Sequence, residues 1–212
     1  MRLAIHNYAE ILAFTIGFIM LTRLRVPMLK LLVAFLFLTV LVELSSLYLT
    51  TNFIIKHSTK IYNFYIGVLI IFFLFFLFVA FKKKINKKIT TYAMFVFLIF
   101  YIININGWQK LNNFNYFSYL LGALFLIILS CMYFFELLGK GEKIFTNSFF
   151  WIASAVLFFF SSTFVYFLFW YFLVQKNADT NGSLFMILIQ IINVIFYLLI
   201  IVSFLCQLKK EK

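Results

Sequence analysis

Two glutamates lie inside apolar stretches, where ionisable side chains are costly and are often functional. His6 and Glu10 are four residues apart, so a helix would place them on one face. Glu43 lies in the next apolar stretch, where steps of four and three residues place it on one helical face with three hydroxyl side chains, namely Thr39, Ser46 and Thr50. These spacings predict two polar helix faces that meet at a similar depth.

Amide side chains occupy three further apolar stretches. Together with the two glutamates they predict an outward-facing pocket that binds a small ligand or a proton, formed by His6, Glu10, Glu43, Asn63, Asn104 and Asn193. A structural interpretation stands beside this one, because buried carboxyls and amides also hydrogen-bond neighbouring helices to each other. The sequence leaves both interpretations open.

The composition defines the elements that must position these side chains. Of 212 residues, 66% are hydrophobic, whereas soluble domains have roughly 45–50% apolar residues. Apolar stretches recur at about the length of 20 residues that a membrane-spanning helix needs. We therefore expect an all-α fold, a single transmembrane domain over residues 1–212, with helices at about 3–21, 28–50, 61–81, 89–107, 116–138, 148–174 and 184–208.

The basic residues predict the orientation. Thirteen of the 18 fall on one set of connecting segments, which includes the sequence KKKINKK at 82–88, and basic residues near span ends are retained in the cytoplasm. This distribution predicts an N-terminus outside and a C-terminus in the cytoplasm. The net charge of +12 is thereby explained by the lipid bilayer, whose anionic head groups attract KKKINKK, and nucleic acid is not expected as a partner.

Signatures of catalysis are sparse. The only histidines are His6 and His57, too few for a metal centre, and we expect neither metal nor cofactor. Residues 184–206 contain no lysine for a Schiff base, which excludes a retinal pigment. We therefore favour the interpretation that the protein is not an enzyme. Two alternatives stay open: a small proton-coupled permease using Glu10 or Glu43, and a lipid-modifying enzyme with carboxylate acid–base chemistry.

Several segments resemble a group of small seven-helix membrane proteins of Bacteroidota whose activity is unassigned. They are LTVLVEL, IYNFY, FNYFSYLLGALFLIILSCMYFFELL, FFWIASAVLFFFSSTF and IINVIFYLLIIVSF. Many members of the group have proline before FWI, where this chain has Ser148 and Phe149. The resemblance implies a multi-pass protein of the cell inner membrane and a neighbouring sensor histidine kinase as partner.

The leading hypothesis is a non-enzymatic sensory or accessory subunit of the inner membrane. Its connecting segments and short tail contain no output domain, so signalling would pass through a membrane partner. Ligand binding would have to favour one helix arrangement over another to transmit a signal.

Overall fold

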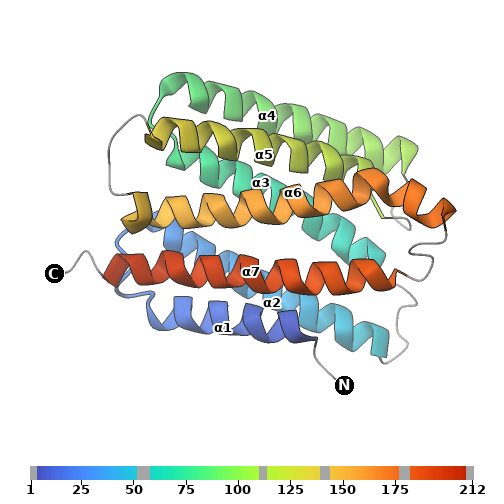
Figure 1. Cartoon of the computed structure of the whole chain (residues 1–212), viewed down its shortest axis with the longest axis horizontal. Coiled ribbons are helices and arrows are strands. Elements are labelled where there is room, and N and C mark those ends of the chain that lie inside the picture. Colours follow the sequence, from blue (N-terminus) through green and yellow to red (C-terminus); the bar gives the residue numbers. More distant parts are fainter. Residues whose placement is uncertain (1–3, 52–57, 110–113, 139–143, 177–181, 209–212) are drawn as a thin grey trace.

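The computed structural model describes residues 4–51, 58–109, 114–138, 144–176 and 182–208. This part of the chain forms helices that lie side by side in one bundle, and it contains no β-strand (Figure 1). The α-helices are α1 (Ile5–Ile19), α2 (Pro27–Thr51), α3 (Thr59–Ala80), α4 (Lys84–Ile103), α5 (Tyr116–Leu138), α6 (Ser148–Gln175) and α7 (Ser183–Leu208). A π-helical turn, η1 (Asn104–Trp108), continues α4, and a short 3-10 turn, η2 (Ile144–Thr146), precedes α6.

The length and composition of these helices are those of a membrane protein. Six of them, α2 to α7, are long and apolar enough to cross a bilayer, and α1 is a shorter apolar helix. Large apolar side chains such as Phe95, Phe135 and Ile187 are exposed on the outside of the bundle, where lipid would contact them. The prediction of an all-α transmembrane bundle of seven helices is confirmed.

The expected helix bounds agree with the observed ones to within a few residues, with the largest difference at α4. This helix begins at Lys84 rather than near residue 89, so most of KKKINKK belongs to the helix. Only residues 81–83 connect it to α3. The carboxylate of Glu136 accepts hydrogen bonds from the backbone at this helix end, and that contact, described below, lets the helix begin among lysines.

The packing order places α3 at the centre of the bundle. It contacts α2, α4, α5 and α6, while α7 packs between α1 and α6. The core around α3 is rich in phenylalanine: the ring of Phe73 makes edge-on contacts with Phe35, Phe160 and Phe196, with ring centroids 5.7, 6.5 and 5.8 Å away. This aromatic layer joins α2, α3, α6 and α7.

The contact of α1 with its two neighbours depends on Gly17. A Cβ atom at this position would lie 2.8 Å from Cε2 of Phe204 on α7 and 2.9 Å from Cγ2 of Val33 on α2. Such distances are too short for any side chain, so glycine allows α1 to approach both helices closely. This close approach fixes the position of the helix that carries Glu10.

Candidate functional site

A large cavity with polar lining lies toward one end of the bundle. At this end α1, α3, α5 and α7 begin, and α2 and α6 end (Figure 1). Its volume is about 620 Å³, and side chains from these six helices line it. It extends inward along α2 and α3 to Thr39 and Phe73. The volume is within the range of roughly 300–1,000 Å³ typical of pockets for small molecules.

Glu43 and two tyrosines form the polar wall of this cavity. The hydroxyl of Tyr62 on α3 donates a hydrogen bond of 2.9 Å to Oε2 of Glu43 on α2. One turn deeper, the hydroxyl of Tyr65 donates to Oγ1 of Thr39 at 3.0 Å, and Thr39 in turn donates to the backbone carbonyl of Phe35 at 3.0 Å. These side chains supply hydrogen bonds between α2 and α3.

Glu10 is buried beside the cavity and does not itself line it. Its side chain is 2% exposed, Oε1 has no hydrogen-bond partner, and Tyr197 of α7 lies within hydrogen-bonding reach of the carboxyl. The carboxyl is also close enough to Glu43 for their charges to interact. The two glutamates that the sequence singles out are therefore neighbours in the structure.

Of the remaining predicted site residues, His6 and Asn193 line the cavity. Both are half-buried, and Nδ1 of His6 has no hydrogen-bond partner. The buried face of α1 does not run through His6, however, because it consists of Asn7, Glu10, Ala13 and Gly17. His6 is thus at the edge of this face.

Asn7 is a cavity residue that the sequence reasoning missed. It is 7% exposed, it lines the cavity, and its carbonyl oxygen Oδ1 has no hydrogen-bond partner. Asn7 and Glu10 are three residues apart, a spacing that places both side chains on one helical face. This spacing could have identified Asn7 from the sequence. An unpartnered buried acceptor is rare in folded proteins and calls for a donor.

Asn63 and Asn104 lie outside the cavity, in a second group of polar side chains, here called the amide cluster: Asn63, Asn104, Gln109, Asn115 and Ser118. Nδ2 of Asn104 donates to Oδ1 of Asn115, to Oγ of Ser118 at 2.9 Å and to Oε1 of Gln109 at 3.2 Å. Oδ1 of Asn63 accepts from the backbone N–H of Asn115 at 2.9 Å. The amide cluster joins α3, η1 and the start of α5, which is a structural role.

Another carboxyl, that of Glu136, is buried near the opposite end of the bundle. One oxygen accepts hydrogen bonds from the backbone N–H groups of Lys82 and Lys83 at 2.8 and 3.1 Å, and the other accepts from Nδ2 of Asn86 at 2.7 Å. Glu136 is 4% exposed, whereas the side chains of Lys82 and Lys83 are exposed. Lys140 and Lys143, the basic residues that follow Glu136 in the sequence, lie outside the described residues.

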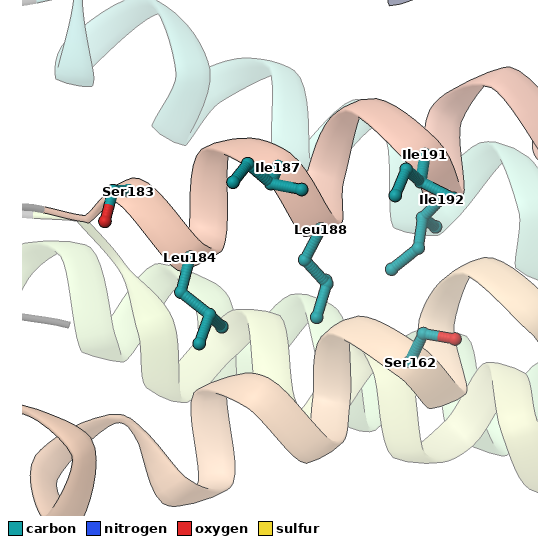
Figure 2. A pocket seen from close by; sticks show the side chains of 7 residues that line it. All are labelled: Ser162, Ser183, Leu184, Ile187, Leu188, Ile191 and Ile192. Carbon is teal, nitrogen blue, oxygen red and sulfur yellow. The ribbon is translucent and has the colours of Figure 1, made fainter. Parts of the chain in front are cut away.

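A second hollow lies between α6 and α7, on the outside of the bundle (Figure 2). Its volume is about 590 Å³, and it is lined by Ser162, Ser183, Leu184, Ile187, Leu188, Ile191 and Ile192. Among the described lining residues, the two serines have the only polar side chains and the others are aliphatic, and Ile187 and Ile191 are more than half exposed. This groove lacks the converging polar groups of the cavity, so the cavity is the stronger candidate site.

The described side chains include no group of three histidine, cysteine, aspartate or glutamate residues that would hold a metal ion. What the cavity offers is hydrogen-bond acceptors, two nearby carboxyls and aromatic surface. Comparison of the chain with family models, curated proteins and solved structures finds no match.

Proposed function

We propose that this membrane protein is a non-enzymatic sensory or accessory subunit that binds a small ligand in the polar cavity around Glu43. The observation that carries the proposal is the convergence of six helices on one cavity, which is lined by the half-buried carboxyl of Glu43 and the buried amide of Asn7. A ligand in this cavity contacts helices that are far apart in the sequence. Its binding energy is therefore available to favour one arrangement of these helices.

The hydrogen bond from Tyr62 to Glu43 is the contact that a ligand would change. It links α2 to α3 at the cavity wall, and an ionised Glu43 would make it one of the stronger links between these helices. A ligand that binds Glu43 competes with Tyr62 for the same carboxylate. Occupancy of the cavity thus changes how the end of α2 is held against α3.

The partner and the orientation belong to the same proposal. The distribution of lysine and arginine supports an inner-membrane protein whose cavity faces outward, with the lysines of residues 82–88 at the cytoplasmic surface and near anionic lipid. In this orientation the cytoplasmic ends of the helices would transmit the signal to a membrane partner such as a sensor histidine kinase.

Copurification from the native membrane tests this function. We expect the tagged protein, extracted in mild detergent, to retain a signalling protein in stoichiometric amount, identified by mass spectrometry. The variant Glu43→Gln should retain the same partner and lose the response of that partner to ligand. A protein that purifies alone from native membranes would contradict the accessory role.

A small proton-coupled permease is the second candidate, favoured by the proximity of Glu10 to Glu43. One of the two carboxyls would take up and release a proton during each transport cycle. Solute counterflow into proteoliposomes distinguishes the two functions, because a permease exchanges labelled solute across the membrane and a sensor does not. Counterflow that is lost in Glu10→Gln or Glu43→Gln would establish transport.

A further inference from the structure

The acidic side chains that the described residues place at the cavity have no basic counterpart of fixed charge. Glu43 lines the cavity and Glu10 lies beside it, while no lysine or arginine is present among the described lining residues. Among the described lining residues, His6 is the only one of a basic type, and it lies in the first turn of α1. A carboxylate in a site of low polarity requires a compensating positive charge or hydrogen-bond donors.

Hydrogen-bond donors and acceptors at the cavity wall are also unequal in how many of them have partners. The hydroxyl hydrogens of Tyr62, Tyr65 and Thr39 are already donated to other atoms of the protein. By contrast, Oδ1 of Asn7, which lines the cavity, and Oε1 of Glu10 beside it have no donor. These three hydroxyls therefore have their hydrogens in use, while two buried acceptors at the cavity are unpaired. A ligand that complements it brings N–H or O–H donors.

Aromatic rings form the deeper part of the wall. Phe73, Phe160 and Phe196 line the cavity, and the edge-on contacts of Phe73 with the other two rings hold them in different planes. Tyr65 and Tyr197 also line the cavity, where Tyr65 hydrogen-bonds to Thr39 and Tyr197 lies within hydrogen-bonding reach of Glu10. Aromatic faces attract cations and also pack against apolar groups. This deeper part therefore suits the apolar part of a ligand whose charged part lies near Glu43.

The size and the ligand set of the cavity favour an organic compound over a metal ion. The volume of about 620 Å³ is far larger than a single ion fills. The described residues also lack a group of three metal-binding side chains. We propose that the cavity binds a small organic ammonium compound with an apolar body. Its N–H groups donate hydrogen bonds to the carboxylate of Glu43 and to Oδ1 of Asn7. This inference rests on the proposed role of the cavity as the ligand site.

The test compares three probes of nearly equal size with the purified full-length protein, by isothermal titration calorimetry in detergent. They are 2-phenylethylammonium, the neutral 2-phenylethanol and the anionic phenylacetate. We expect the ammonium compound to bind at least about tenfold more tightly than the alcohol, because hydrogen bonds to a carboxylate from a cation are the stronger ones. Phenylacetate should not bind detectably. This comparison uses the native protein and needs no variant.

A pair of variants then assigns the charge that is recognised. Glu43→Gln keeps the shape of the side chain, and we expect it to remove the preference for ammonium over alcohol. Glu136→Gln removes a buried carboxyl far from the cavity and should keep the preference. Circular dichroism of both variants verifies that the helices have formed.

The outcomes separate the two proposals. Equal binding of ammonium and alcohol, or tighter binding of phenylacetate, would overturn the ammonium inference and leave the cavity as a ligand site. Failure of all three probes to bind would overturn the ammonium inference, whereas the copurification experiment decides the accessory role independently. A preference for ammonium that persists in Glu43→Gln would overturn the role of Glu43.

Discussion

Glu136 and Glu43 are two glutamates in the same bundle whose surroundings differ. Glu136 accepts two backbone hydrogen bonds and one from Asn86, and it lies at the N-terminal end of α4, where the helix dipole favours a negative charge. Glu43 accepts one hydrogen bond from Tyr62 and faces a cavity. The protein thus satisfies one carboxylate completely and leaves the other accessible.

This difference indicates which of the two carboxyls, Glu43 or Glu136, to associate with function. A carboxylate whose oxygens are occupied by backbone donors stabilises the fold, since its removal leaves those donors without partners. A carboxylate with open acceptor capacity beside a cavity adds less to stability and can bind a ligand. Both glutamates interrupt apolar sequence, so the sequence pattern alone does not distinguish them.

The largest effect should come from Glu136→Leu. The substitution leaves two N–H groups at the start of α4 and the amide of Asn86 without an acceptor, and we expect a loss of about 3 kcal/mol in the free energy of unfolding. Equilibrium unfolding in mixed detergent measures it. Phe135→Leu, on the exposed neighbouring position, is the control and should change stability little. If both variants unfold alike, Glu136 is not the helix cap described here.

A smaller loss should follow Asn104→Leu. The side-chain amide of Asn104 donates to Asn115 and Ser118, which lose a partner without it, so we expect about 2 kcal/mol of destabilisation. Because the amide cluster lies outside the cavity, the affinity for 2-phenylethylammonium should stay the same. Loss of binding in a folded Asn104→Leu protein would place Asn104 in the ligand site after all.

Tyr62→Phe tests the link between the cavity and the fold. It removes one hydrogen bond to Glu43 and should cost about 1 kcal/mol, measured by the same unfolding experiment. The freed carboxylate should bind the ammonium probe at least as well as in the native protein, as calorimetry would show. Weaker binding would mean that Tyr62 contacts the ligand directly rather than competing with it.

The smallest change in stability should come from Glu43→Gln. Glutamine can still accept the hydrogen bond from Tyr62, and we expect the free energy of unfolding to stay within about 0.5 kcal/mol of the native value. The same variant should lose the ammonium preference. A loss of stability as large as that of Glu136→Leu would remove the distinction between the two carboxylates.

The sequence predicts the helices well because each is an apolar stretch of nearly membrane-spanning length, with Pro27 at the first position of α2. It also points to Glu10 and Glu43, because a carboxyl in an apolar stretch is visible without a structure. The contacts of Asn63, Asn104 and Glu136 are different, since they depend on which helices are neighbours and how each is rotated. Sequence spacing within one helix contains neither quantity.

His6 and Asn7 are an example of a helix rotation that the sequence does not determine. Successive residues on a helix point about 100° apart, so the face through Glu10 can be extended with steps of three or four. The structure selects the step of three, and Asn7 is buried while His6 is half-exposed. The packing of α1 against α2 and α7 decides this rotation.

The length of α1 has a consequence for the surrounding membrane. Its 15 residues span about 22 Å, roughly a quarter less than the 30 Å hydrocarbon thickness of a typical bilayer. A hydrophobic segment that is too short is accommodated by local thinning of the bilayer. Water and head groups would then lie closest to the interior on the side of the bundle where α1 carries Asn7 and Glu10. Lipid thickness would in this way control how readily a polar solute reaches the cavity.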